Sequence, residues 1–251
     1  MRPLLIVHGI NSNARSTYGA PGKFSKKGRS KSMFTFLESI GYKAGQDLFW
    51  YSYQTRRPIS ISMNILKAQI TKTLQLTHST EVDLLTFSLG GIISKYYLIS
   101  PCYQNEVKRL IMIAPPFLGS HRADWIQTLF PQRKEVSLHE GVAKLWTPQI
   151  LSYHHPVLMQ LAKIPFPKDV TTTIIAMKQE IAEQGLISIY LRALTRWVGE
   201  GDLTVPLEST KIDVDYHLEI HEEFSRKAIH GFLPDNPGVQ HYVAQQLGLA
   251  L

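Results

Sequence analysis

The sequence predicts an α/β fold in which a mostly parallel central sheet is flanked by helices. Two observations lead to this prediction. Short apolar runs of strand length alternate along the chain with stretches whose apolar residues recur at spacings of three and four. Such alternation is typical of parallel sheets, because a helix usually carries the chain back to the start of the next strand. The predicted strands are residues 3–7, 47–53, 82–87, 110–114 and 170–177.

The predicted helices lie between these strands and after the last one. Residues 33–40 stop at Gly41, a residue type that favours the C-terminal ends of helices, and residues 90–98 directly follow a strand-like run. A longer amphipathic helix is predicted from one apolar stripe, formed by Ile59, Met63, Leu66, Ile70 and Leu74. A last helix opens with Pro237 and Gly238, and its stripe is formed by Val239, Val243 and Leu247.

Two segments fall outside this alternation. Residues 9–32 are rich in glycine, asparagine and serine and are predicted as a loop. Residues 119–169 hold five prolines together with many large apolar side chains, namely Trp125, Phe130, Trp146, Tyr153, Leu158, Met159 and Phe166. Because strand-like runs resume at Val170, we interpret residues 119–169 as a cap or lid inserted into a single domain of residues 1–251. A fixed cap and a lid over an acyl pocket both fit this composition.

The composition excludes several classes of protein. With 251 residues, 44% of them hydrophobic, the chain is long enough for a sizeable core and too apolar for wholesale disorder. No run of roughly 18 apolar residues predicts a transmembrane helix. No signal-peptide pattern follows Met1, so the predicted location is cytoplasmic. The single cysteine, Cys102, excludes an intrachain disulfide and a cysteine-based zinc site.

The chain is basic, with 27 lysines and arginines against 20 aspartates and glutamates. A local cluster is formed by Lys23, Lys26, Lys27, Arg29 and Lys31. Such a cluster is usually a solvated face, and its functional alternative is peripheral contact with an anionic membrane surface. No nucleic-acid-binding motif accompanies it, so nucleic acid is not predicted as a partner.

Residues 82–91 carry the most informative chemical signal. A buried strand-like run leads directly into Ser88, and Gly90 and Gly91 open the predicted helix behind it. This is the pattern of a nucleophile elbow, a sharp strand-to-helix turn that lifts a serine hydroxyl above the sheet. Gly90 has the small size that the turn requires, whereas Thr86 stands where glycine is usual. The alternative is a serine that only caps a helix.

A serine nucleophile needs a histidine base and an orienting carboxylate, and in this architecture the acid precedes the histidine in the chain. Asp202 lies in the loop of residues 199–206, which carries Gly199 and Gly201, and His230 lies in a later loop. Ser88, Asp202 and His230 are therefore the predicted catalytic residues. The competing acids are Asp213 and Asp215, and the competing base is His221.

The other histidines are not predicted to take part in the chemistry. His8 is expected to shape the loop after the first strand. A metal site is the alternative for four further histidines, namely His154, His155, His217 and His221. No cysteine or dense acidic cluster accompanies them, so neither a metal nor a cofactor is predicted.

Taken together, these motifs resemble those of the α/β-hydrolase superfamily, most closely its lipase-like members, including bacterial lipases and GPI-inositol-deacylase-like proteins. The matching segments extend over nearly the whole chain and comprise residues 4–10, the elbow at Ser88, and residues 114–120, 201–206, 230–231 and 237–239. The resemblance implies a trimmed form of the fold, because the chain begins at the strand that leads into His8 and Gly9.

The resemblance also implies residue roles. Its nucleophile falls on Ser88, its acid on Asp202 and its base on His230. Its oxyanion donors are backbone N–H groups, which fall on Leu89 and on Ile10 or Asn11. The predicted function is hydrolysis of carboxylic esters, with lipid-like substrates favoured, through an acyl-enzyme. The alternatives are a thioesterase or acyltransferase with the same site, or a binding protein that kept the fold and lost activity.

Overall fold

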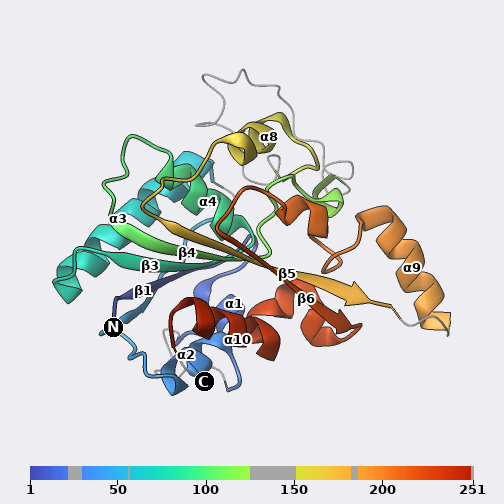
Figure 1. Cartoon of the computed structure of the whole chain (residues 1–251), viewed down its shortest axis with the longest axis horizontal. Coiled ribbons are helices and arrows are strands. Elements are labelled where there is room, and N and C mark those ends of the chain that lie inside the picture. The colour runs from blue at the N-terminus through green and yellow to red at the C-terminus, as the bar shows by residue number, and fades with distance from the viewer. Residues whose placement is uncertain (22–29, 56, 125–150, 182–185, 250–251) are drawn as a thin grey trace.

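A computed structural model of the chain describes residues 1–21, 30–55, 57–124, 151–181 and 186–249 (Figure 1). Most of the basic cluster at residues 23–31 lies outside the described residues, as do Trp125 and Trp146 of the predicted insertion. Across the ranges described, no helix combines the length and apolar character needed to cross a membrane.

Six parallel strands form the central sheet, in the order β2-β1-β3-β4-β5-β6. Their bounds are β1 Leu4–Val7, β2 Leu48–Trp50, β3 Val82–Phe87, β4 Val107–Ile113, β5 Thr171–Glu180 and β6 Tyr216–Glu223. The predicted parallel α/β architecture is confirmed. All carboxyl ends of the strands therefore meet at one edge of the sheet, the carboxyl edge, which is where open α/β sheets bind ligands.

The strand predictions differ from the structure at the sheet's margins. The predicted strand at residues 47–53 is shorter, since only Leu48–Trp50 pairs with β1. β4 begins three residues earlier than predicted, at Val107, and β5 continues to Glu180. β6 was not predicted at all. It is an edge strand of mostly half-buried or exposed residues, several of them charged, so it lacks the apolar run that marks the inner strands.

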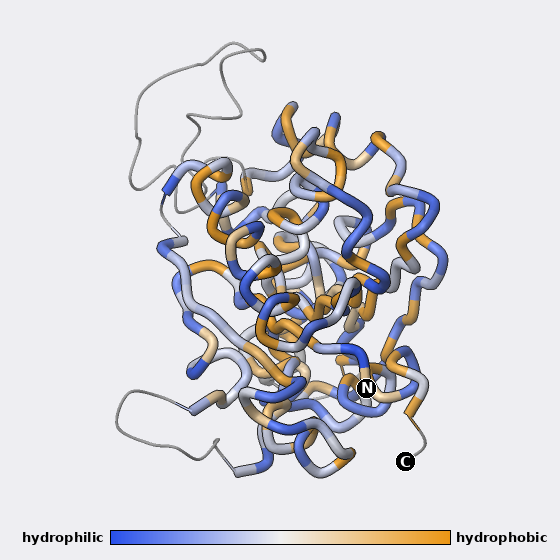
Figure 2. The backbone as a smooth tube through the Cα atoms, turned by 90° about the vertical axis from the view of Figure 1, so that its left-hand side faces the viewer, coloured by the Kyte–Doolittle hydropathy of each residue, from blue (hydrophilic) through white to orange (hydrophobic). Residues whose placement is uncertain are grey.

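Helices cover both faces of the sheet (Figure 1). One face carries α3 (Ile59–Thr77), α4 (Leu89–Leu98) and α8 (Pro156–Lys163), and the other carries α1 (Ala14–Tyr18), α2 (Met33–Ser39) and α10 (Pro237–Gln246). The remaining elements are α9 (Leu186–Val198) and three short 3-10 helices, η1 (Leu207–Thr210), η2 (Arg226–Ala228) and η3 (His230–Asp235). The tube in Figure 2 changes colour every few residues along much of its length, as expected for elements with one buried and one exposed side.

The strand side chains divide between two apolar clusters, one on each side of the sheet. In β1, Leu5 and Val7 pack toward α3 and α4, whereas Leu4 and Ile6 pack toward α1, α2 and α10. This is the two-residue alternation of a strand, with both faces buried because helices cover both. The inner strands are therefore continuously apolar, which is why their sequence signal is strong.

Three helices are not among those predicted from the sequence, namely α1, α8 and α9. α1 is only five residues long and lies inside the segment predicted as a loop, where the side chain of Asn13 caps its first turn. α9 follows the end of β5, and its apolar residues lie mainly on one side, with Tyr190, Leu194 and Trp197 at spacings of four and three, so its sequence does carry the helical pattern. The described part of the 119–169 segment includes α8, whose Leu158 and Leu161 are buried in the core.

Candidate active site

Ser88 stands at the sharp turn between β3 and α4. Its backbone has φ 52° and ψ −122°, a positive φ that is unfavourable for a residue with a Cβ atom. Within the described residues, its side chain caps no N–H group of α4. The alternative in which Ser88 merely caps the helix is therefore wrong.

Gly90 permits the close approach that this turn needs. A Cβ atom at Gly90 would lie 2.7 Å from the carbonyl oxygen of Val7 and 3.0 Å from that of His8. Thr86, which replaces the usual glycine on the other side of the serine, is fully buried in β3. Its Oγ1 donates to the carbonyl oxygen of Ile111 at 3.4 Å, so the sheet accommodates the threonine.

The structure brings Ser88, His230 and Asp202 into one hydrogen-bonded chain. The hydroxyl of Ser88 lies 3.0 Å from Nε2 of His230, and Nδ1 of the same ring lies 2.6 Å from Oδ2 of Asp202. An ionised carboxylate can only accept, so it keeps the proton on Nδ1 and leaves Nε2 as the acceptor for the serine hydroxyl. The His230 ring also packs on Phe87, with 4.7 Å between ring centroids.

Asp202 is held in place by its own loop. Its Oδ1 accepts the backbone N–H groups of Thr204 and Val205 at 3.0 and 2.8 Å, while Oδ2 faces His230. The backbone N–H of His230 donates to the carbonyl oxygen of Asp202 at 3.0 Å. The carboxylate is 1% exposed, so these bonds replace the water that an ionised group requires.

Two loops meet beside the Ser88 hydroxyl. Leu89 is the first residue of α4, and the first N–H groups of a helix have no acceptor within it. From the other side, the loop after β1 lies so close that a Cβ atom at Gly9 would be 3.1 Å from Cβ of Ser88. Ile10 follows Gly9 in that loop. The N–H of Asn11 donates to Oγ1 of Thr55 at 3.0 Å, so this amide is already engaged.

His8 anchors the loop that carries Gly9 and Ile10. It is fully buried, its Nδ1 donates to the carbonyl oxygen of Gly9 at 2.8 Å, and its Nε2 accepts the N–H of Tyr53 at 3.1 Å. The hydroxyl of Tyr53 donates to the carbonyl oxygen of His8 at 2.7 Å, and the two rings stack. Burial lowers the pKa of His8, which favours the neutral ring that these bonds require. The expectation of a loop-shaping role agrees with this geometry.

The comparisons with known proteins agree on the fold. A family model described as lecithin:cholesterol acyltransferase matches residues 14–127. Solved structures match much more of the chain, although no curated protein matches it by sequence. The mature lipase of Bacillus licheniformis is 18% identical, with a TM-score of 0.66 over 99% of this chain and 92% of that one.

Two further solved structures are a phospholipase from Legionella pneumophila and a metagenomic carboxyl esterase. The phospholipase is 16% identical, with a TM-score of 0.59 over 84% of this chain and 45% of that one. The esterase is 14% identical, with a TM-score of 0.60 over 98% of this chain and 75% of that one. The chain has the α/β-hydrolase fold. Its predicted resemblance to lipase-like members of that superfamily is confirmed.

Two of the competing residues, Asp215 and His221, lie elsewhere on this α/β-hydrolase fold. Asp215 accepts the N–H and hydroxyl of Thr172 at 2.7 and 2.9 Å, at the start of β5 and hence at the sheet edge opposite Ser88. His221, on β6, faces Glu180 and Glu219 at 3.4 and 3.6 Å. Among the described residues, no group of three or more histidine, cysteine or acidic side chains could hold a metal ion.

Hydrogen bonds from the hydroxyls of two serines, which the sequence did not predict, support the loop of residues 199–206 (the acid loop), which holds Asp202. The hydroxyl of Ser120 donates to the carbonyl oxygen of Thr204, and Arg122 donates to the Thr204 hydroxyl at 3.2 Å. The hydroxyl of Ser209 donates to the carbonyl oxygen of Gly119 at 2.7 Å. The segment of residues 114–120, noted above only for its resemblance, therefore supports the loop that holds Asp202. Its only sequence signal was that resemblance.

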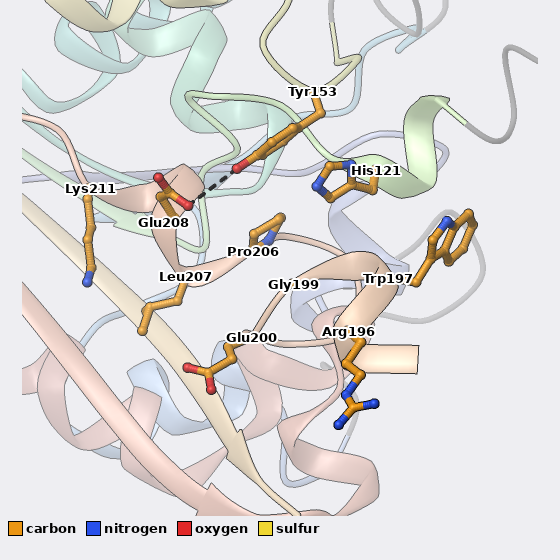
Figure 3. A pocket seen from close by; sticks show the side chains of 10 residues that line it. All are labelled: His121, Tyr153, Arg196, Trp197, Gly199, Glu200, Pro206, Leu207, Glu208 and Lys211. Carbon is orange, nitrogen blue, oxygen red and sulfur yellow. Dashed lines mark hydrogen bonds between the residues drawn. The ribbon is translucent and has the colours of Figure 1, made fainter. Parts of the chain in front are cut away.

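A cavity of about 340 Å³ lies on the outer side of the acid loop (Figure 3). Its walls come from the end of α9, the acid loop, η1 and the segment that holds Tyr153, and they mix basic with acidic side chains. The Tyr153 hydroxyl donates to Glu208 across it at 3.5 Å. None of the three residues of the Ser88 hydrogen-bonded chain lines it, so this cavity is separate from the candidate active site.

Proposed function

We propose that this protein is a serine hydrolase that cleaves carboxylic esters, with lipid-like acyl groups as its substrate class. One observation carries the proposal. Ser88, His230 and Asp202 form a continuous hydrogen-bonded chain with distances of 3.0 and 2.6 Å, on a strained turn at the carboxyl edge of the sheet. Nucleophile, base and orienting acid in this order are the parts that acyl transfer to serine requires.

The first chemical step follows from these contacts. Nε2 of His230 takes the proton of the Ser88 hydroxyl as Oγ attacks the ester carbonyl carbon, and Asp202 stabilises the imidazolium that forms. The oxyanion receives hydrogen bonds from the backbone N–H groups of Leu89 and Ile10. Each such donor is worth roughly 3–4 kcal/mol in other enzymes. We favour Ile10 over Asn11 because the amide of Asn11 donates to Thr55.

The second step releases the acyl group. His230 gives its proton to the leaving alkoxide, and the acyl group stays on Ser88. Water then attacks the acyl-enzyme with His230 again as the base, which yields the free acid and restores the serine. No metal or cofactor enters either step.

The preference for lipid-like substrates rests on the comparisons and on the inserted segment. Two of the similar structures are named as a lipase and a phospholipase. The described part of the insertion places Phe166 against Phe117, with 6.4 Å between ring centroids, and buries α8 on the same side as α4. These contacts support a packed cap as the role of this part of the segment. Trp125 and Trp146 lie outside the described residues, and their proposed contribution to an acyl pocket is carried by the sequence alone.

Labelling with a fluorophosphonate probe tests the serine chemistry, because the probe reacts with activated serines. We expect labelling of the wild-type protein and none of Ser88→Ala. A screen of p-nitrophenyl esters of increasing chain length then tests the substrate class, since each buried methylene adds up to roughly 0.8 kcal/mol. A folded wild-type protein that the probe does not label would instead support the binding-protein alternative.

Acyl transfer to an alcohol is the second candidate, because the matching family model is that of an acyltransferase. It uses the same acyl-enzyme and differs only in which nucleophile attacks second. Product analysis with a long-chain alcohol in the reaction separates the two. Ester formation in preference to free acid would favour the acyltransferase, and free acid alone would favour the hydrolase.

A further inference from the structure

Helix α9 exposes an apolar face to solvent. Four large apolar side chains are exposed on it, namely Ile189 (58%), Tyr190 (77%), Leu194 (37%) and Trp197 (54%). Tyr190, Leu194 and Trp197 are spaced by four and three residues, so they share one side of the helix. Val198, the last residue of the helix, is buried. The surface of a monomeric soluble protein rarely gathers so many large apolar side chains on one short helix. This cluster therefore indicates an interaction site.

The charged side chains of the helix itself are positive. Arg192 and Arg196 are the charged residues of α9, and the helix contains no acidic residue. Glu200, just beyond its end, is paired with Lys178 at 2.7 Å. Aromatic and aliphatic side chains on one side of a helix and arginines on its polar side are typical of helices that lie in the interface of an anionic membrane. A second copy of this chain fits less well, because the whole protein carries a net charge of +7.

The helix also lies at the carboxyl edge of the sheet, which Ser88 shares. β5 runs five residues past Ile175, which pairs with the last residue of β4, and α9 begins beyond its carboxyl end. Figure 1 shows α9 beyond the tip of the β5 arrow. Ser88 follows the carboxyl end of β3, which is parallel to β4 and β5. The helix and the serine therefore share the carboxyl edge of the sheet.

We propose that the exposed face of α9 docks the protein on an anionic lipid bilayer, with Tyr190 and Trp197 inserted among the headgroups. A helix of 13 residues is about 20 Å long, which suits a helix lying in the interface and is too short to span the bilayer. The docking itself does not depend on Ser88. Docking through α9 would turn the carboxyl edge toward the lipid surface. The value of this orientation for substrate access rests on the proposed ester hydrolysis.

Co-sedimentation with vesicles tests the docking, in a Ser88→Ala background so that no lipid is hydrolysed. We expect binding to mixed phosphatidylcholine–phosphatidylglycerol vesicles and much weaker binding to pure phosphatidylcholine. The double variant Tyr190→Ser, Trp197→Ser should weaken binding by about tenfold or more, because the apolar face supplies part of the affinity. Arg196→Gln should weaken it less, and mainly at low salt.

The matched control removes an exposed leucine and an exposed lysine from α3, at the opposite edge of the sheet, as Leu76→Ser, Lys72→Gln. This variant should bind vesicles like the parent. Equal vesicle binding by the α9 variant and this control would overturn the proposal, as would a lack of binding by the parent. A dimer in solution that dissociates on the α9 substitutions would also overturn it, since a second copy would then cover the face. A protein that binds vesicles but hydrolyses no ester would keep the docking and refute the proposed function.

Discussion

Two buried aspartates lie at opposite edges of the sheet, and their partners differ. Asp83, at the start of β3, is 1% exposed and faces the guanidinium groups of Arg2 and Arg109 at 3.1 and 3.4 Å. Asp202, in the loop at the carboxyl edge, is equally buried and faces the imidazole of His230 at 2.6 Å. Burial alone therefore does not distinguish a structural carboxylate from a candidate catalytic one.

The difference lies in what the partner can do with a proton. An arginine stays charged throughout the range in which proteins fold, so the Asp83 cluster can only hold charge in place. A histidine can gain and lose a proton near neutral pH, and the second nitrogen of His230 faces a hydroxyl. Burial raises the pKa of Asp83 more than its two arginines lower it, which marks that site as an electrostatic compromise in the fold.

The largest effect is expected when a residue of the hydrogen-bonded chain of Asp202, His230 and Ser88 is substituted and ester hydrolysis is measured. Ser88→Ala and His230→Ala should each lower ester hydrolysis by about four to six orders of magnitude, because such residues act as a unit. Asp202→Asn should cost about 10⁴ in kcat through loss of tautomer control. Initial rates with a short-chain p-nitrophenyl ester measure these losses, and thermal melts establish that each variant is folded. If His221→Ala removed activity while His230→Ala kept it, the base assignment would be wrong.

Substituting Asp83 should instead affect stability and leave catalysis nearly unchanged. Asp83→Ala should lower the free energy of unfolding by about 1–3 kcal/mol, because it leaves the partly buried guanidinium groups of Arg2 and Arg109 without the acceptor that they share. The kcat of the folded fraction should stay near that of the wild type, since Asp83 lies at the other edge of the sheet. Urea unfolding and steady-state kinetics measure both. A large loss of kcat at unchanged stability would contradict the separation of the two sites.

A smaller, pH-dependent effect should come from His8, the second buried histidine near Ser88. Burial lowers its pKa below the ordinary value of 6.5. The unfolded chain therefore binds more protons than the folded one just below that pH, and this contribution to stability is lost as the pH falls through the window. His8→Phe should reduce the acid dependence of the unfolding free energy relative to His241→Phe, an exposed control on α10. Parallel slopes for the two variants would count against this assignment.

A second pH-dependent effect on stability, at alkaline pH, is expected at Lys95, a buried lysine on α4. Its Nζ donates to the carbonyl oxygen of Ala162 at 3.2 Å and lies 4.3 Å from the ring centroid of Phe166. Burial lowers its pKa from 10.5 to about 8, so the unfolded chain binds more protons between those values and stability rises with pH there. Lys95→Met should flatten this alkaline rise. Urea unfolding across that pH range measures it, and an unchanged slope would place the titrating group elsewhere.

The sequence by itself determined the inner strands, the elbow at Ser88 and the chain order of the three candidate catalytic residues. These features are local: strands buried on both faces need continuous apolar runs, and a sharp strand-to-helix turn needs Gly90. β6 lacks the apolar run that predicts a strand, because an edge strand is partly exposed and keeps charged residues. α9 carries the pattern of an amphipathic helix, with Tyr190, Leu194 and Trp197 at spacings of four and three, so its existence was within reach of the sequence, whereas the exposure of its apolar side is visible only in the tertiary structure.

Only the tertiary structure decided which polar groups meet. Asp202 and His230 are 28 residues apart, and Ser88 and His230 are 142 apart, so neither bond could be chosen from local pattern over its competitors. The same holds for the amide of Asn11, which Thr55 engages from 44 residues away. Whether a hydrogen bond forms depends on the donor–acceptor distance to within a few tenths of an ångström. Packing of the helices on both faces of the sheet sets those distances, and no short stretch of sequence encodes them.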